Sequence, residues 1–355
     1  MRWIAPEYSK KRVRRAGELL IQPDASDQEI STAMDVLSNW RSAHAYPMHS
    51  ILIFLRKKAS EVDPKAVVVQ RLKRTPSILW KLERFQSMML DRMQDIGGCR
   101  AVVREVGRVE KLYQKIMYSR TRHKLHKIDN YIETPKPSGY RGIHLIYKYN
   151  GAKKQYQDYF VEIQLRSKIQ HAWATAVEIV DAFTSQALKA SHGDPDWLNF
   201  FLYASAELAG LESRPVGEHV NGIDTKSQLQ RLSTKLNAVE RLRAFTVSTD
   251  FIVGKIETKS DYFILDLSES AKEIRVTRFP SGQLEEATNE YLRREKRAVK
   301  EKDYDVVLVS ASSIHNLQAA YPNYFADSRQ FLSYLNRVLN DNKANSAGAK
   351  SRAAD

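Results

Sequence analysis

The sequence has one cysteine among 355 residues, which excludes a fold held together by several disulfides and indicates a reducing compartment. No apolar run approaches the roughly 18 residues that a membrane helix requires. Met1 to Gln22 also lacks the apolar core of a signal peptide. There is no internal repeat. These absences predict a cytoplasmic protein with no membrane partner.

Acidic residues are also in deficit, because 42 Asp and Glu stand against 56 Lys and Arg. The formal net charge of +14 and the isoelectric point near 9.6 favour a polyanionic partner over a small acidic metabolite. We expect RNA or nucleotides, and we do not expect DNA. The length predicts two domains, and an apolar content of 43% is enough for two cores.

The most informative segment is cationic and runs from Arg71 to Arg84. If residues 77–90 form a helix, then Ser77, Lys81 and Arg84 lie on one face. Ser77 would stand at the N-terminus, where the helix dipole favours anions. A solvated basic helix is the alternative for any such run.

Asp95 follows this segment and precedes Gly97-Gly98, which we expect to form a turn that a nucleotide can approach closely. The apolar run Ala101 to Val103 is typical of the start of a buried strand. A carboxylate at a strand edge is a natural ligand for Mg²⁺. Together with the cations before it, Asp95 predicts a site for a triphosphate and its metal ion.

A loop rich in Pro and Gly places Lys136, Tyr140, Arg141 and His144 within nine positions, just before the β-rich run Leu145 to Tyr149. An aromatic face stacks on any nucleobase, and nearby cations meet phosphates. The loop therefore suits a second nucleotide, although Tyr140 in a simple turn is the alternative.

Two further blocks complete the pattern. Tyr159 to Arg166 alternates as a half-buried strand that exposes Glu162, Gln164 and Arg166 on one face. Gln170 to Glu178 is a helical stretch that ends in a second candidate carboxylate.

In these motifs and in their order, the chain resembles the synthetase domain of RelA/SpoT proteins, over about residues 45–185. The resemblance implies an α+β fold of nucleotidyltransferase type, with a mixed β-sheet flanked by helices. It also implies an enzyme that moves a pyrophosphate group from ATP to a ribose 3′-hydroxyl with the aid of Mg²⁺.

The resemblance assigns roles to individual positions. The residues that would bind ATP are Arg71, Lys73, Ser77, Lys81, Arg84 and Arg100. Asp95 and Glu178 would be the catalytic acids that carry Mg²⁺, and Glu178 would also help deprotonate the acceptor hydroxyl. The residues that would bind the acceptor are Lys136, Tyr140, Arg141 and His144.

Two positions depart from the family pattern. Glu178 falls five residues after Trp173, where small synthetases place the acid four residues after the Trp, and one residue turns a helix by about 100°. Asp181 is a weaker substitute. Asp129 stands where small alarmone synthetases often place a basic residue, and its charge would repel a free GTP tail.

The segment before the domain, residues 1–44, predicts a basic and helical region, with a helix start at Asp24 to Asp27. It has no His-Asp pair of the kind found in the hydrolase domain of long RelA/SpoT proteins, so we expect no degradation of the product. Two basic clusters would contact RNA if they lie beside the acceptor site. The candidates are Lys11, Arg12, Arg120, Arg122 and Lys124, and solvated surface is the alternative.

After about residue 185 the synthetase motifs stop. Residues 186–246 predict a helical brace, residues 247–340 predict a small C-terminal domain of β-β-β-α-β-α order, and residues 341–355 predict a disordered tail. The C-terminal domain has no Cys and only His315, which excludes a usual structural zinc site.

Tyr321 and Tyr324 flank a proline in the C-terminal domain. Their spacing and the missing zinc ligands resemble CapRel, the fused toxin–antitoxin members of the family, whose pseudo-zinc-finger domain inhibits the synthetase until a phage protein is sensed. The two tyrosines would then be regulatory, with simple core packing as the alternative.

We therefore expect an ATP- and Mg²⁺-dependent pyrophosphokinase. Its acceptor would be the 3′ end of tRNA, in an autoinhibited toxin of anti-phage defence. The first alternative is a (p)ppGpp alarmone synthetase that uses GDP or GTP. A different class is a catalytically inactive RNA-binding protein on the same scaffold.

Overall fold

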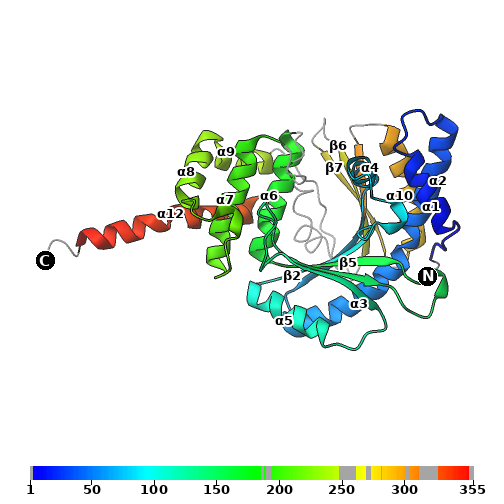
Figure 1. Cartoon of the computed structure of the whole chain (residues 1–355), viewed down its shortest axis with the longest axis horizontal. Coiled ribbons are helices and arrows are strands. Elements are labelled where there is room, and N and C mark those ends of the chain that lie inside the picture. The colour runs from blue at the N-terminus through cyan, green and yellow to red at the C-terminus, as the bar shows by residue number, and fades with distance from the viewer. Residues whose placement is uncertain are drawn as a thin grey trace.

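The structure is a computed structural model that describes residues 3–184, 188, 193–247, 261–268, 273–280, 282–300, 304–311 and 327–351. Its described strands form one mixed sheet of eight with helices packed around it, which confirms the α+β class (Figure 1). The strand order is β3-β4-β5-β2-β1-β8-β6-β7. β2 and β5 are parallel, and the other neighbouring pairs are antiparallel.

The strands are β1 (Val67–Leu72), β2 (Gly97–Val103), β3 (Lys124–Asn130), β4 (Ile143–Lys148), β5 (Phe160–Ser167), β6 (Asp261–Ser268), β7 (Glu273–Phe279) and β8 (Tyr304–Ala311). Apolar side chains alternate along β2 and β5, and one set of them is buried against α3 (Ala45–Val62) and α5 (Val106–Met117). Burial of each large apolar side chain contributes about 1.5–3 kcal/mol, so this layer is a main source of stability. It leaves the opposite face of the central strands for polar residues.

The N-terminal segment is part of the core of the molecule. α1 (Lys10–Leu19) and α2 (Asp27–Ala43) share a buried cluster with α4 (Thr75–Arg84) and the short η1 (Leu90–Arg92). Ser26 begins α2 with a capping box to Glu29, which confirms the expected helix start. The N-terminal helices therefore hold α4, the helix that carries three of the residues predicted to bind ATP.

A second group of helices packs at the other side of the sheet (Figure 1). It comprises α6 (Lys168–Thr184), α7 (Pro195–Leu211), α8 (Thr225–Lys235), α9 (Ala238–Val247) and α12 (Arg329–Ser351), with the short η4 (Glu218–Val220) in a connecting loop. The short η2 (Lys154–Tyr156) lies between β4 and β5, and its Tyr156 is buried in the N-terminal cluster. Trp197, Phe200, Phe201 and Phe331 form its buried centre. This bundle corresponds to the expected brace, and α12 joins it from the C-terminal part of the chain.

The described strands of the C-terminal part do not form a sheet of their own, whereas a separate domain was expected. β8 pairs with β1, so β6, β7 and β8 extend the sheet of the synthetase region. α10 (Leu284–Lys300) packs on β6 and β8 through Tyr291, Ile264 and Val306. The observed order β6, β7, α10, β8, α12 matches the last five expected elements, and the first expected strand lies outside the described residues.

Three local expectations were wrong. The helix expected at residues 77–90 ends at Arg84, because Leu90 is buried against Gly17 of α1 and the chain must leave the helix axis to reach it. Gly97 and Gly98 belong to β2 and do not form a turn. The helix α12 continues to Ser351, past the expected start of a disordered tail, in a segment rich in the strong helix former Ala.

In the described part of the chain, none of the helices combines the length and the apolar composition that a membrane crossing needs.

Candidate active site

Strand register gathers several predicted site residues on one face of the sheet. Arg71 of β1 lies opposite Gly98 of β2, and Val69 lies opposite Arg100. Because side chains alternate between faces, Arg71, Gly98 and Arg100 point to the same side. Arg71 and Arg100 are therefore diagonal neighbours, which suits two guanidinium groups that contact one ligand.

The neighbouring strands extend this side with more polar residues. Glu162 of β5 lies opposite Gly98, and Gln164 lies opposite Arg100. His144 of β4 lies opposite Gln164. We call this side the active-site face and define it by Arg71, Gly98, Arg100, His144, Glu162 and Gln164.

Gly98 leaves the middle of the active-site face without a side chain. A Cβ atom built on Gly98 would have only the carbonyl oxygen of Arg71 within 4 Å, at 3.8 Å. A ligand can therefore lie close to the backbone between Arg71 and Glu162. Gly98 was expected to form a turn, but it instead leaves open space over the backbone of the sheet, which we call the open floor.

Asp95 lies immediately before β2 and is held by two lysines. Lys73 Nζ donates to Asp95 Oδ2 at 2.9 Å, and Lys81 Nζ donates to Oδ1 at 3.1 Å. Burial raises the pKa of Asp95, but the charges of the two lysines outweigh burial and hold the pKa below its usual value. Asp95 is ionised at neutral pH, and the three groups together carry one positive charge.

α4 presents the remaining donor residues. Ser77 lies in its first turn, where backbone N–H groups lack partners within the helix and the dipole favours an anion. Arg84, in the last turn, places its guanidinium 5.1 Å from the ring centre of Trp80. Trp80 is 40% exposed, so Arg84 lies at the solvent-exposed end of the row formed by Ser77, Lys81 and Arg84. The structure thus keeps Ser77, Lys81 and Arg84 on one short helix.

Glu162 lies at the centre of a hydrogen-bonded chain that connects the donor and acceptor residues. His144 Nδ1 lies 2.8 Å from Glu162 Oε1, and His144 Nε2 lies 2.5 Å from the Tyr140 hydroxyl. Gln164 Nε2 donates to the second oxygen of Glu162 at 2.7 Å. Glu162 is also close enough to influence the pKa of Asp95.

The charges in this chain stabilise one another. Burial raises the pKa of Glu162, but His144 lowers it more, to about 2. Burial lowers the pKa of His144, but Tyr140 and Glu162 raise it to about 9. At neutral pH the pair is therefore a carboxylate and an imidazolium, and both ring nitrogens of His144 donate.

Arg166 and Arg100 complete the polar network. Arg166 donates to the Tyr140 hydroxyl through Nε and Nη2, at 3.2 and 3.0 Å. Burial raises the pKa of Tyr140, but Arg166 and His144 bring it down to about 8. Arg100 Nε donates to Gln164 Oε1 at 3.3 Å. The network fixes the Tyr140 ring while its hydroxyl stays fully occupied.

Lys136 lies beside the predicted stacking residue. Its Nζ lies 4.4 Å from the ring centre of Tyr131 and 5.3 Å from that of Tyr140. Gly139 lies between Lys136 and Tyr140 in the sequence and has φ of +87°. A Cβ added to Gly139 would lie 2.9 Å from Ser205 Cβ, so only glycine fits this close turn against α7. A base that stacks on Tyr140 would have to move the Lys136 ammonium group aside.

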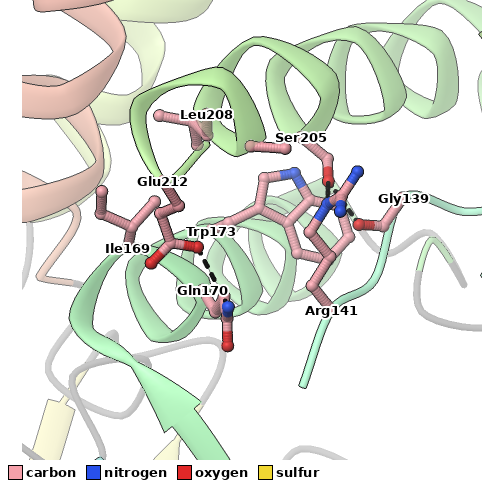
Figure 2. Close-up of a pocket in the computed structure, with 9 residues that line it drawn as sticks. Gly139, Arg141, Ile169, Gln170, Trp173, Ser205, Leu208 and Glu212 are labelled. Atoms are coloured by element: carbon pink, nitrogen blue, oxygen red, sulfur yellow. Dashed lines mark hydrogen bonds between the residues drawn. The ribbon is translucent and has the colours of Figure 1, made fainter. Parts of the chain in front are cut away.

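Arg141 does not join the acceptor residues. It is 5% exposed and donates to Ser205 Oγ, to the Ile132 carbonyl and to the Val216 carbonyl. Figure 2 shows its guanidinium directed toward α7 beside a cavity of about 10 Å³, which is room for a single water at most. The expected contact of Arg141 with the acceptor is thus replaced by bracing of the loop, since its donors are used inside the protein.

Glu162 is the residue that sequence reasoning missed as an acid. Strand alternation places Glu162 on an exposed face with Gln164 and Arg166. The family resemblance, however, assigned the second metal-binding acid to the helix that follows. Glu178 lies on that helix, α6, whose neighbours include α7, α9 and α12. Glu162 stands across from Gly98, three residues after Asp95, and this sheet register is the signal that only the fold supplies.

The metal-binding capacity of the site rests on few ligands. Among the described residues, no group of three or more His, Cys, Asp or Glu side chains is arranged to hold a metal ion. Asp95 and Glu162 offer two ionised carboxylates. Mg²⁺ usually binds one or two carboxylates together with substrate phosphates and waters, so this donor set fits it.

Of the basic residues proposed to contact RNA, Lys124 lies away from the acceptor residues. Lys124 begins β3 opposite Lys148, and Asn130 ends it opposite Ile143, about 20 Å along the strand. Arg120, Arg122, Lys11 and Arg12 are exposed, the last two on or near the first turn of α1. RNA contact was expected if the basic clusters lie beside the acceptor site. The position of Lys124 does not meet this condition.

Asp129 is compensated in the structure. Lys127 Nζ lies 2.9 Å from Asp129 Oδ2. The repulsion that was expected for a free GTP tail is weakened by this ion pair. Tyr321 and Tyr324 lie outside the described residues.

Comparison with known proteins supports the synthetase region. Residues 70–180 match the family described as the region found in RelA / SpoT proteins. The GTP pyrophosphokinase of Escherichia coli (strain K12) is 31% identical over 119 residues, which are 33% of this chain and 15% of that protein. The GTP pyrophosphokinase of Shigella flexneri matches with the same figures. The chain thus spans about 15% of the length of the curated relatives it matches.

Two solved structures with some likeness have the following figures. The small alarmone synthetase 1 from Bacillus subtilis, bound to its product pppGpp, is 25% identical, with 47% of this chain and 90% of that chain covered and a TM-score of 0.39. A GTP pyrophosphokinase family protein from Streptococcus pneumoniae is 23% identical, with 47% and 84% covered and a TM-score of 0.39. Residues 70–180 thus match the region found in RelA / SpoT proteins, as their motifs predicted.

Proposed function

We propose that the chain is a pyrophosphokinase that transfers the β,γ-pyrophosphate of ATP to a ribose 3′-hydroxyl. The observation that carries this proposal is the grouping of Lys73, Lys81, Asp95 and Glu162 within the region that matches the RelA/SpoT family. Phosphoryl transfer needs charge neutralisation and positioning more than covalent help from the protein. These residues offer both.

The donor would bind across the active-site face. The adenine would lie against Arg71 and Arg100, and the phosphates would reach Ser77, Lys81 and Arg84 on α4. Lys73 and Lys81, which now pair with Asp95, would turn part of their charge to the phosphate oxygens. Asp95 and Glu162 would hold Mg²⁺, which supplies charge neutralisation at the β- and γ-phosphates when bound.

The transfer is balanced without a further reactant. The acceptor 3′-oxygen forms a bond to the β-phosphorus, the bond from that phosphorus to the α,β-bridging oxygen breaks, and AMP leaves. The transition state of such transfers is loose, so the hydroxyl proton departs late and a weakly basic carboxylate can receive it. We assign this role to Glu162 in place of Glu178.

The acceptor base would stack on Tyr140 after Lys136 moves aside, and His144 would orient Glu162 and Tyr140 beside the ribose. We propose the 3′-terminal adenosine of tRNA as the acceptor, supported by the net charge of +14, which favours a polyanionic partner. The alternative acceptor is GDP or GTP, favoured by the pairing of Asp129 with Lys127 and by the names of the relatives.

One assay separates these acceptors. The protein is incubated with γ-³²P-labelled ATP and Mg²⁺, with either tRNA or GDP, and the label is followed by electrophoresis and thin-layer chromatography. Label on tRNA supports the first acceptor, and label on GDP alone removes it. No label on either acceptor, while ATP binds, would favour an inactive RNA-binding scaffold.

From the resemblance to CapRel we also propose that the chain is an autoinhibited toxin of the cytoplasm that a phage protein releases. Tyr321 and Tyr324 would then restrain the site. Tyr324→Ala should raise basal transfer and toxicity, measured by label transfer and by growth after induction. Tyr118→Ala makes the same chemical change at an exposed position and serves as the matched control. An unchanged basal rate in Tyr324→Ala would leave the aromatic residues as packing.

A further inference from the structure

A buried polar cluster joins the C-terminal helix α10 to the start of the donor segment. Arg41 of α2 lies between Glu295 and Tyr291 of α10 and contacts Thr75 at the first position of α4. All four residues are buried, and Arg41 is 1% exposed. The cluster therefore connects three parts of the chain that are far apart in sequence.

Hydrogen bonds connect all four side chains of the cluster. Arg41 Nη1 donates to Thr75 Oγ1 at 3.0 Å and to Glu295, and Arg41 Nη2 donates to the Tyr291 hydroxyl. Thr75 and Tyr291 each donate to Glu295 Oε1, at 2.9 Å. A buried ion pair without such bonds would be costly, so these hydrogen bonds make the arrangement stable.

The cluster also fixes the backbone of a donor residue. Arg41 Nε donates to the carbonyl oxygen of Lys73 at 2.9 Å. The N–H of Lys73 donates to the carbonyl of Ile96, at 2.8 Å, next to Asp95. The Lys73 residue is thus held on both sides, by Arg41 through its carbonyl and by the chain after Asp95 through its N–H.

The carboxylate of Glu295 lies at the N-terminus of α4, because it accepts from Thr75. A negative charge there stabilises the helix start, which lacks a side-chain cap of its own. The helix start carries Ser77, and Lys81 follows one turn later. The position of α4 relative to Asp95 therefore depends on a residue of α10.

We propose that Arg41 and Glu295 are positioning residues of the donor site, and that the C-terminal helix α10 is required for tight binding of a nucleoside triphosphate. This inference rests on the proposed function, since it concerns the residues of α4, and Lys73 before it, that would bind the ATP phosphates. It differs from restraint by Tyr321 and Tyr324, because here the C-terminal part of the chain supports the site.

Three variants test the proposal on the full-length protein. Glu295→Gln keeps the shape and removes the charge. Arg41→Met with Glu295→Met replaces the ion pair by apolar side chains, a change that often preserves stability. Glu286→Gln makes the same chemical change at an exposed position of the same helix and serves as the control.

The readouts are the dissociation constant of a non-hydrolysable ATP analogue by calorimetry, the KM values for ATP and for the acceptor, kcat, and the melting temperature. Glu295→Gln should weaken analogue binding and raise the KM for ATP by about 10- to 100-fold, because the lysines and Asp95 lose their alignment. The KM for the acceptor and the Glu286→Gln control should stay unchanged. The double variant Arg41→Met with Glu295→Met should melt at the wild-type temperature but should keep the raised KM for ATP.

The outcomes separate the inference from the proposed function. If this double variant restores both melting temperature and ATP affinity, the cluster is packing and the positioning role is overturned. Equal ATP affinity in folded Glu295→Gln and wild type overturns it as well. If Glu295→Gln does not fold, the milder Tyr291→Phe, which removes one hydroxyl, must still raise the KM for ATP. A wild type that binds no ATP analogue overturns the proposed function itself.

Discussion

Replacement of Glu162 by Gln discriminates between the two candidate acids. The change keeps the size of the side chain and the hydrogen bond to Gln164, but it removes the charge that pairs with His144 and that would hold Mg²⁺. Glu178→Gln on α6 is the matched control. We expect transfer to be lost in the first variant and retained in the second.

The magnitude follows from two terms. Removal of a carboxylate that positions the metal and receives a proton typically lowers kcat by about 10²- to 10⁴-fold, or roughly 3–5 kcal/mol in the barrier. For stability, the pKa of Glu162 falls from its usual 4.5 to about 2. That difference corresponds to about 3 kcal/mol at pH 7, which the variant loses.

The assay measures kcat with labelled ATP and the acceptor, after circular dichroism has shown that both variants are folded and calorimetry that both bind an ATP analogue. A folded Glu162→Gln variant that keeps more than a third of the activity, or a Glu178→Gln variant that loses more, would refute the assignment of Glu162.

Two further predictions concern the same face. Gly98→Val should fill the open floor and raise the KM for ATP by at least about tenfold, while the melting temperature changes little, because the Cβ has only one neighbour, at 3.8 Å; an unchanged KM would show that the nucleotide does not lie there. The pKa of His144 is raised to about 9 from 6.5, so its stabilising charge is complete below pH 6.5 and is lost as the pH rises through 9. Transfer should fall as the pH rises through about 9, where His144 loses its proton in the folded protein. Tyr140→Phe should move this fall to lower pH, because Tyr140 helps to raise that pKa; an unmoved pH profile would contradict the coupling.

The sequence predicted the donor and acceptor segments because their chemistry is local. Lys73, Lys81 and Asp95 lie within 23 positions, and cations at helical spacing beside an acid predict a phosphate site without any tertiary information. The structure brings the three together as expected.

Glu162, the proposed second acid, could not be predicted in the same way. Glu162 becomes a neighbour of Asp95 only because β5 pairs in parallel with β2, and parallel pairing joins segments that are distant in sequence. Arg141 shows the reverse error, since a cation in a Gly-rich loop was expected at the ligand but is used to brace the loop against Ser205.

The place of the C-terminal strands also lay beyond the sequence. The order of β6, β7, α10 and β8 was largely predicted from local patterns, yet the edge of β1 that receives β8 carries no pattern of its own. A pairing across more than 200 positions depends on the whole fold. The result is a C-terminal part that shares the sheet and the core of the synthetase region.

The most direct test of the account is whether Asp95 is needed to move the label from γ-³²P-labelled ATP to an acceptor hydroxyl. The account predicts that the wild type transfers label with release of one AMP per transfer. It also predicts that Asp95→Asn, which keeps the side chain size and removes the charge, lowers the rate by at least about 100-fold. Transfer by Asp95→Asn at a rate near that of the wild type would contradict the central claim.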